Sequence, residues 1–254
     1  MNLQLLDPVR ITVVQNSPDV TLDTFADLLG PDVRLVRPFA GDALPDPTDI
    51  GDGLVVLGGE MSAYADDVAP WLPALRALLS AAVISAVPTL GICLGAQLLA
   101  VATGGGVKVG EDGPEVGPYL VGKRDTGSSD PLFGELPLMP DVLHFHSDVV
   151  DPLPPDSVLL ASATRYPNQA FRVGRAAYGL QFHIETTTDT VLAWARDDPD
   201  TAEFASPGAL DVERLDQLHA DIEETWRPVI TKFVQLAAGD LAPAPPPQLR
   251  LLGH

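Results

Sequence analysis

The chain has 254 residues, of which 46% are hydrophobic, and its 35 acidic residues outnumber the 15 basic ones to give a formal net charge of -20. This charge opposes nonspecific binding to nucleic acid phosphates and to anionic lipid, so we expect neither nucleic acid nor a membrane as a partner. No segment approaches the roughly 18 consecutive apolar residues of a membrane span. The N-terminus lacks a signal-peptide pattern and there is one cysteine, which predicts a cytoplasmic protein without disulfides.

The first part of the chain alternates predicted strands with predicted helices. Strands are expected over 9–14, 33–36, 54–57 and 87–90, and helices over 22–29, 69–82 and 94–103. The helix at 69–82 carries its leucines on one face, as an amphipathic helix does. Such alternation predicts an α/β fold with a mostly parallel central sheet and helices on both faces.

From 107 to 184 the pattern changes to short strands separated by Pro and Gly turns. This indicates a smaller antiparallel portion, which we expect to supply a histidine to the functional site. Helices follow at 190–197 and 212–238, and the second carries an apolar stripe at helical spacing: Leu215, Leu218, Ile222, Trp226, Ile230 and Phe233. That stripe predicts packing against the core rather than a cofactor site.

The domain organisation follows from these patterns. We expect a single domain over 1–240, in which about 189–240 forms a C-terminal helical extension. The remaining segment, 241–254, is rich in proline and is expected to be a flexible tail.

Cys93 is the only cysteine and lies in a Gly-x-Cys-x-Gly sequence between a predicted strand and a predicted helix. A sharp strand-to-helix turn of this kind exposes a nucleophile above the sheet, with the N–H of the next residue beside it. The N-terminus of the helix also favours a thiolate. The alternative is that Cys93 is simply a small buried apolar residue.

His183 and Glu185 lie two residues apart in Gln-Phe-His-Ile-Glu, which is expected to be a short strand over 181–185. Because side chains alternate along a strand, both residues would lie on one face. A histidine beside a cysteine can take the thiol proton, and a carboxylate can orient its ring. A purely structural His–Glu pair is the alternative.

An apolar strand over 54–57 ends in Gly58 and Gly59. Such a loop allows backbone N–H groups to point into a site. An oxyanion hole needs two converging donors, and the N–H groups of Gly59 and Leu94 could supply them. An ordinary strand-to-loop Gly-Gly is the alternative.

Three motifs therefore occur in order: Gly-Gly-Glu-Met-Ser at 58–62, Gly-Ile-Cys-Leu-Gly-Ala-Gln at 91–97 and Gln-Phe-His-Ile-Glu at 181–185. In this order and at these separations they resemble the class I, or triad, glutamine amidotransferases. The likeness is greatest to free-standing proteins similar to the glutaminase domain of GMP synthase, which often share Asn-Gln-Ala-Phe-Arg, found here at 168–172. It covers roughly residues 10 to 235 and implies the flavodoxin-like α/β fold of that family.

The resemblance implies a cysteine-dependent amidohydrolase that releases ammonia from the side chain of L-glutamine and then glutamate from a γ-glutamyl thioester. Carried onto this chain, Cys93 is the nucleophile, His183 the general base and acid, and Glu185 the orienting carboxylate. These three residues form the predicted triad. The reaction uses no cofactor.

The resemblance also implies the surroundings of the substrate. Gly59 and Leu94 correspond to the oxyanion donors. Gln97, one helical turn after the nucleophile, corresponds to a substrate contact, and Ser147 and Asp148 of a His-x-Asp loop would meet the amino acid end of glutamine.

Two positions depart from the family pattern. Ile184 stands between the histidine and the glutamate where the family most often has proline, and Ser147 stands where relatives of the GMP synthase type often have glycine. Neither change removes a reacting group. Both lie close to the expected pocket, so they leave the substrate open.

His144, His146 and Asp148 alternate along an apparent strand and could instead be metal ligands on one face. No second cluster supplies an obvious open catalytic metal site, and thiol chemistry needs no metal. We therefore expect no metal, and a structural role for His144.

Three functions remain open at this point. A glutamine amidotransferase would pass ammonia to a separate acceptor, because the sequence contains no recognisable nucleotide-binding or acceptor-modifying domain. A stand-alone hydrolase would use the same triad on a γ-glutamyl amide or peptide. A catalytically silent module would bind a metabolite or a partner.

Overall fold

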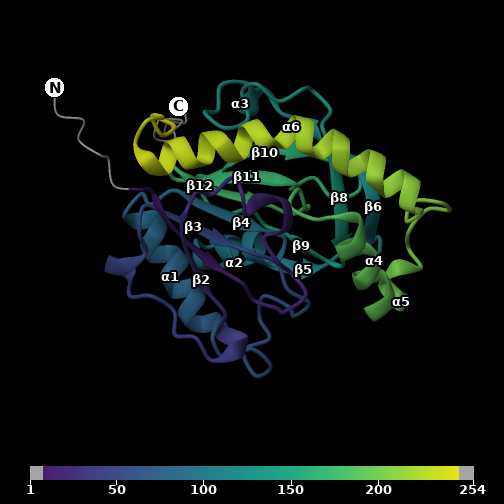
Figure 1. Cartoon of the computed structure of the whole chain (residues 1–254), viewed down its shortest axis with the longest axis horizontal. Coiled ribbons are helices and arrows are strands. Elements are labelled where there is room, and N and C mark those ends of the chain that lie inside the picture. Colours follow the sequence, from purple (N-terminus) through teal and green to yellow (C-terminus); the bar gives the residue numbers. More distant parts are fainter. Residues whose placement is uncertain (1–7, 246–254) are drawn as a thin grey trace, which may run out of the picture.

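The structure, a computed structural model, describes residues 8–245 of the chain. Its largest element is an eight-stranded sheet (Figure 1) in the order β2 (Asp32–Val36), β1 (Arg10–Val14), β3 (Gly53–Val56), β4 (Thr89–Ile92), β12 (Ala177–Leu180), β11 (Ala170–Val173), β10 (Val158–Ser162) and β7 (Gly122–Lys123). Pairing is parallel from β2 to β12 and antiparallel from β12 to β7. The α/β fold with a mostly parallel centre is therefore confirmed.

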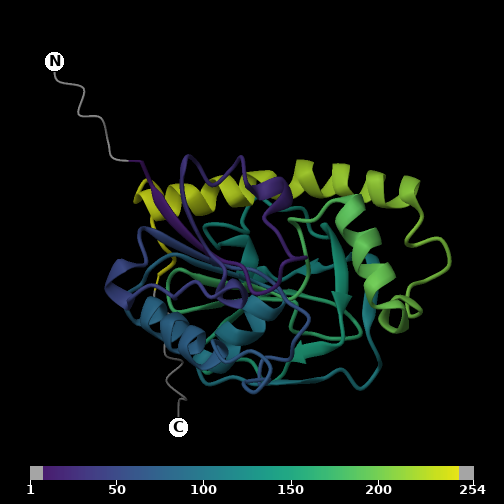
Figure 2. The same cartoon turned by 60° about the horizontal axis from the view of Figure 1, so that its bottom comes forward.

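Helices cover both faces of this sheet. α1 (Leu72–Ile84) and α2 (Leu94–Ala102) lie on one face, and the long α6 (Val212–Ala238) lies on the other, as two views of the molecule show (Figures 1 and 2). The alternation of side chains along β3 explains the two layers. Leu54 and Val56 belong to the core under α1 and α2, whereas Val55 belongs to the core under α6.

The segment between α2 and β12 builds two small antiparallel sheets. β5 (Val107–Val109) pairs with β9 (Asp148–Val150), and β6 (Glu115–Leu120) pairs with β8 (Asp141–His146). The strands β7, β10 and β11 of the same segment instead extend the central sheet. Three short helices complete the fold: α3 (Asp125–Ser128), α4 (Thr188–Asp197) and α5 (Pro199–Ala202).

The predicted helix over 22–29 is wrong. The structure has only one 3-10 turn there, Asp23–Phe25. Asp23 has a φ of 36°, which lies outside the right-handed helical region, and the N–H of Thr24 donates to the carbonyl of Glu185 at 3.1 Å. A regular right-handed helix therefore does not run through this segment.

The predicted strand over 181–185 is also wrong. β12 ends at Leu180, and beyond it His183 makes a single two-way bridge with Leu143, at 2.8 and 3.2 Å. His183 consequently follows β12, which pairs parallel with β4 on one side and antiparallel with β11 on the other. The adjacent β4 carries the cysteine turn, so both catalytic candidates lie at the carboxyl ends of neighbouring strands.

The helix predicted over 212–238 is confirmed. α6 ends at Ala238 and is followed by Gly239, whose φ of 79° suits a C-terminal cap. Every residue of its predicted apolar stripe is buried. After it, Ala244 is buried and pairs with Arg175 through two hydrogen bonds of 3.1 Å. The rest of the predicted tail, 246–254, lies outside the described residues. None of the helices within 8–245 combines the length and the apolar character that a membrane crossing requires.

Candidate active site

Cys93 occupies the turn between β4 and α2, as the sequence predicts. Its φ of 50° and ψ of -109° are unusual for a residue with a side chain. The turn is held by the Cys93 N–H, which donates to the carbonyl of Leu180 at 2.7 Å, and by the Cys93 carbonyl, which accepts from the N–H of Gln97 at 3.0 Å. Such backbone strain persists where the surrounding structure over-determines it, and it is typical of functional sites.

The glycines on either side of Cys93, Gly91 and Gly95, allow neighbouring backbone segments to pack closely. A side chain on Gly91 would lie 2.5 Å from the carbonyl oxygen of Gly95, and one on Gly95 would collide with the main chain of Val56 in β3. Neither glycine has a positive φ. The strained torsion angle therefore falls on the cysteine itself, and the glycines allow α2 to approach the sheet.

The imidazole of His183 is bound to Glu185, with Nδ1 2.6 Å from the carboxylate oxygen Oε1. The other oxygen accepts from the N–H of Ile184 at 2.9 Å, and the side chains of His183 and Glu185 are both buried. Nδ1 of His183 is bound to the Glu185 carboxylate. Nε2 is therefore the ring nitrogen that can act on other groups of the site.

Neighbouring negative charges decide whether the His183 imidazole is protonated. Burial by itself lowers the pKa of His183, but the negative charges of Glu185 and Cys93, with their hydrogen bonds to the ring, outweigh burial and raise the pKa to about 10. This arrangement favours an imidazolium at His183, beside Cys93. A histidine placed next to a cysteine in this way is the usual means of activating a cysteine nucleophile.

The loop that contains Gly58 and Gly59 lies directly beside Cys93 and His183. A side chain on Gly58 would approach His183 Cε1 to 3.4 Å and Cys93 Cβ to 3.6 Å, and one on Gly59 would approach Leu94 to 2.9 Å. The loop is held from behind by Asn16, whose Nδ2 donates to the carbonyl of Leu57 at 2.8 Å. Among the described residues, no hydrogen-bond acceptor faces the N–H of Gly59.

These elements border a cavity of about 530 Å³. It is lined by Ser17, Asp19, Val20, Gly59, Glu60, Met61, Ser62, Cys93, Gln97, Phe145, His146, Ser147, Asp148, His183, Trp194, Asp197, Asp198 and Thr201. The structure therefore brings most of the sequence-predicted site residues to one cavity. Glu185 lies behind His183, and Leu94 lies against Gly59.

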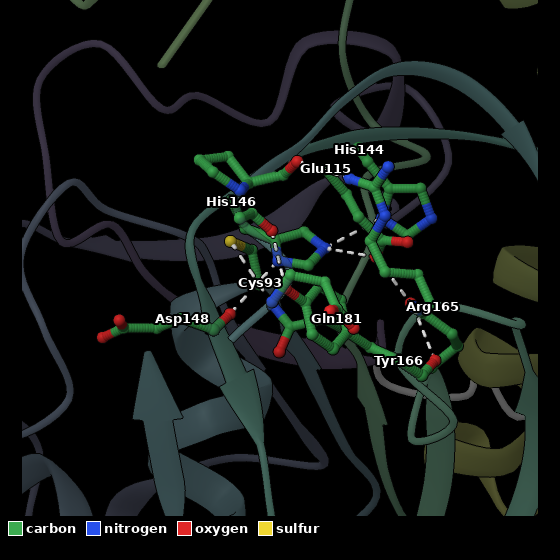
Figure 3. Close-up of polar contacts among 12 residues, drawn as sticks. Cys93, Glu115, His144, His146, Asp148, Arg165, Tyr166 and Gln181 are labelled. Atoms are coloured by element: carbon green, nitrogen blue, oxygen red, sulfur yellow. Dashed lines mark hydrogen bonds and ion pairs between the residues drawn. The ribbon is translucent and has the colours of Figure 1, made fainter. Parts of the chain in front are cut away.

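Gln97 is buried in this cavity wall. Its Nε2 donates to the carbonyl of Asp148 at 3.0 Å and lies 3.4 Å from Oε1 of Gln181. Gln181 in turn has its Nε2 4.0 Å from the sulfur of Cys93 (Figure 3). Gln97 thus ties the Ser147–Asp148 segment to the helix that carries the nucleophile.

Two residues of the site lie outside the sequence motifs. Trp194 of α4 lies against His183 in a tilted arrangement, with ring centroids 4.9 Å apart, and no motif distinguishes it. Glu115 lies beside His144 and His146 (Figure 3), although it is 29 residues before the nearer of the two. Only the antiparallel pairing of β6 with β8 brings Glu115 opposite His146.

The possible cation ligands differ from those that the sequence suggested. Ligand atoms of Glu115, His144 and His146 lie within 4.8 Å of one another, close enough for one metal ion. The strand that was expected to carry all three sequence-based ligands is broken at Ser147, because β8 ends at His146 and β9 begins at Asp148. Burial and the neighbouring His146 lower the pKa of His144 to about 3, so this ring is neutral.

Comparison with known proteins agrees with this geometry. The family model "Glutamine amidotransferase class-I" matches residues 32–191. The glutamine amidotransferase-like protein YfeJ of Salmonella typhimurium is 33% identical over 61% of this chain and 65% of its own length. A GMP synthase (glutamine-hydrolyzing) of Thermomicrobium roseum is 38% identical over 52% of this chain, which spans only 23% of that relative.

Solved structures extend the similarity over nearly the whole chain. A glutamine amidotransferase of Thermotoga maritima has a TM-score of 0.78 and 28% identity, covering 91% of this chain and 98% of its own. A glutamine amido transferase of Methylobacillus flagellatus has a TM-score of 0.79 and 25% identity, covering 96% and 99%. The family match includes β4, its cysteine turn and the His183–Glu185 pair. This chain therefore belongs to the class I glutamine amidotransferase family.

Proposed function

We propose that the chain is a glutaminase, which hydrolyses the side-chain amide of L-glutamine through a γ-glutamyl thioester on Cys93. The observation that carries this proposal is the His183–Glu185 pair, 2.6 Å apart, beside a cysteine held at a φ of 50°. Family membership supports the same reaction.

In the first step the Cys93 sulfur attacks the amide carbon of glutamine, and a C–S bond forms. The amide oxygen becomes an oxyanion, for which the N–H groups of Gly59 and Leu94 are the proposed donors. His183 Nε2 gives its proton to the amide nitrogen, the C–N bond breaks, and ammonia leaves.

In the second step water attacks the thioester carbon and gives a proton to His183. The C–S bond breaks, which returns the Cys93 thiolate and releases glutamate. Glu185 stays ionised throughout and holds the ring so that Nε2 faces the cavity. Gln97, Ser147 and Asp148 are the proposed contacts for the rest of the substrate, because all three line the cavity.

The ammonia is proposed to reach a separate acceptor enzyme. The chain spans about a quarter of the GMP synthases that it matches, but 51% of a shorter relative from Pyrococcus abyssi, whose name makes it one of the subunits of a glutamine-hydrolyzing GMP synthase. This relative supports an arrangement in which glutaminase and acceptor are different polypeptides.

A second candidate is a stand-alone hydrolase of γ-glutamyl amides. The observation in its favour is the cavity lining, which includes the carboxylates of Asp19, Glu60, Asp197 and Asp198, while no lysine or arginine occurs among the described residues that form it. Such a rim favours a γ-glutamyl amide whose amine part carries a positive charge. Release of glutamate from a γ-glutamyl diamine, compared with release from glutamine, separates the two candidates.

The first experiment is intact mass spectrometry after incubation with a diazo-ketone analogue of glutamine. Stoichiometric labelling of the wild type that is absent in Cys93→Ala is the expected result. Iodoacetamide provides the control, because it reports a reactive thiol without requiring a glutamine pocket. Alkylation by iodoacetamide without labelling by the analogue would contradict a glutamine site.

A further inference from the structure

Glu185 is held at its main chain as well as at its carboxylate. The carboxylate has two partners from its own motif, His183 Nδ1 at 2.6 Å and the N–H of Ile184 at 2.9 Å. The carbonyl oxygen of Glu185 accepts two further hydrogen bonds, both from Thr24: one from its N–H at 3.1 Å and one from its hydroxyl at 3.0 Å. Thr24 is 161 residues away in the sequence, so this double contact exists only in the folded chain.

An unusual turn presents Thr24 to this carbonyl. Asp23, the residue before it, has a φ of 36°, which is strained for a residue with a side chain and persists only where the surroundings impose it. The Asp23 carboxylate can only accept, and the hydroxyls of Thr21 and Thr190 both donate to it, the second at 2.5 Å. Thr190 belongs to α4. The turn is therefore anchored to the helix that follows Glu185 in the chain.

Thr186, the residue after Glu185, is held from α6. Its side chain is buried, and its hydroxyl lies 3.0 Å from Nε2 of His219. The other ring nitrogen, Nδ1, lies 3.2 Å from the hydroxyl oxygen of Thr188, whose proton goes to the Asp216 carboxylate at 2.6 Å. Nδ1 must therefore donate to Thr188. Nε2 then accepts from Thr186 when the ring is neutral and donates to it when the ring is charged, so His219 holds Thr186 in either state.

These contacts act on the peptide that joins Glu185 to Thr186. Among the described residues that line the cavity, neither Thr24 nor Thr186 occurs, so neither is placed to touch a substrate. A shift of this peptide would move the Glu185 carboxylate relative to His183, and a charge-assisted hydrogen bond of 2.6 Å depends closely on the position of both groups. The contacts therefore bear on the proposed catalytic base and not on substrate binding.

We propose that Thr24 and His219 are positioning residues: Thr24 holds the carbonyl of Glu185, His219 holds Thr186, and together they keep the Glu185 carboxylate against His183. This inference rests on the proposed function, to which it adds two residues that lie outside the sequence motifs. Loss of either contact loosens the peptide from one side and lengthens the bond between the carboxylate and the imidazole.

The first test is a proton resonance. The Nδ1 proton of His183 lies in a hydrogen bond of 2.6 Å, and a proton in so short a bond resonates far downfield of an ordinary imidazole N–H. Its absence from His183→Gln assigns the signal. It should move upfield in Thr24→Val and in Thr186→Val, and farther in the variant that carries both changes. Thr24→Ser keeps the hydroxyl and should leave the signal in place.

Thr231→Val is the matched control. Thr231 is exposed on α6, as Thr24 is exposed in its turn, and its hydroxyl donates to a main-chain carbonyl, that of Arg227, at 3.0 Å. The signal should be unchanged in this variant. Because Thr24 is exposed, Thr24→Val keeps the proposal testable even if Thr186→Val, which alters a buried residue, does not fold. An unchanged signal in Thr24→Val would overturn the proposal, and so would its absence from the wild type or an equal shift in Thr231→Val.

Steady-state kinetics with glutamine provide the second test. Thr24→Val should lower kcat about threefold or more and leave KM near that of the wild type, because a misplacement of about 1 Å costs up to about 100-fold and the substrate contacts are not changed. Thr24→Ser should restore kcat. A higher KM with an unchanged kcat would contradict a role in positioning the base.

The two tests separate the inference from the proposed function. A wild type that neither hydrolyses glutamine nor reacts with its diazo-ketone analogue contradicts the glutaminase proposal, while the proton resonance still decides whether Thr24 positions Glu185. An active wild type whose resonance is unchanged in Thr24→Val contradicts the role of Thr24 and leaves the glutaminase proposal intact.

Discussion

The indole of Trp194 lies against the imidazole of His183, with ring centroids 4.9 Å apart and ring planes inclined by 59°. Its Nε1 donates to the carbonyl of Asp19 at 2.9 Å, which ties α4 to the loop after β1. A residue outside every sequence motif thus lies against His183, the proposed catalytic base. It limits the positions that the ring can take.

Truncation of the Trp194 side chain should reduce activity without abolishing it. We expect Trp194→Ala to lower kcat/KM for glutamine about tenfold, because an aromatic pair contributes up to about 1.5 kcal/mol. Trp194→Phe keeps a ring against His183 and loses only the bond to Asp19, so it should retain most of the activity. Steady-state kinetics check this order. Equal losses in both variants would indicate that the hydrogen bond to Asp19, and not the contact between the rings, is what matters.

The strain at Cys93 predicts an unusual response of stability to substitution. Cys93→Ala and Cys93→Gly should both lack activity. Cys93→Gly should nevertheless be the more stable by about 1 kcal/mol, since glycine adopts a φ of 50° and a ψ of -109° with less strain. Denaturant unfolding of the two variants measures the difference, and greater stability of Cys93→Ala would argue against strain at this position.

Gly95 should not tolerate a side chain. A Cβ there would lie 2.8 Å from the carbonyl carbon of Val56, and Gly95 and Val56 are both buried. We expect Gly95→Ala to lower the free energy of unfolding by about 3 kcal/mol or more and to abolish labelling of Cys93. Gly122→Ala is the matched control, because a Cβ at Gly122 makes ordinary contacts of 3.5 and 3.6 Å. Denaturant unfolding should show it near wild type.

The raised pKa of His183 predicts a pH dependence of stability. The pKa is about 10 in the folded chain against 6.5 for an unperturbed histidine, so the folded state binds this proton more tightly. The resulting stabilisation is fully present below about pH 6.5 and is lost as the pH rises through about 10. Denaturant unfolding at several pH values should therefore show a decline in wild type that is weaker in His183→Gln.

Glu185→Gln tests the cause of that shift. It removes the main charge that favours the imidazolium, so its stability should also depend less on pH than that of the wild type between about pH 6.5 and 10. A decline as steep as in the wild type would mean that the charge of Glu185 does not raise the pKa of His183.

Local sequence was sufficient for much of the fold. The alternation of buried strands with amphipathic helices predicted the parallel centre, and the apolar stripe of α6 predicted a helix with the observed bounds, Val212–Ala238. It was not sufficient at 22–29, where Asp23 has a φ of 36° and Thr24 bonds to Glu185, or at 181–185, where His183 makes a single bridge with Leu143. Propensity cannot anticipate partners that the chain meets only after folding.

The same division holds for the site. The sequence by itself indicated which groups are proposed to react, because Cys93, His183 and Glu185 lie in short motifs suited to that chemistry. Tertiary structure alone decided what surrounds them: the contact of Trp194 with His183, the pairing of Glu115 with His146, and the strain carried by Cys93 instead of its glycines. The physical reason is that reactivity belongs to a side chain, whereas position, charge state and strain arise from contacts between residues far apart in the chain.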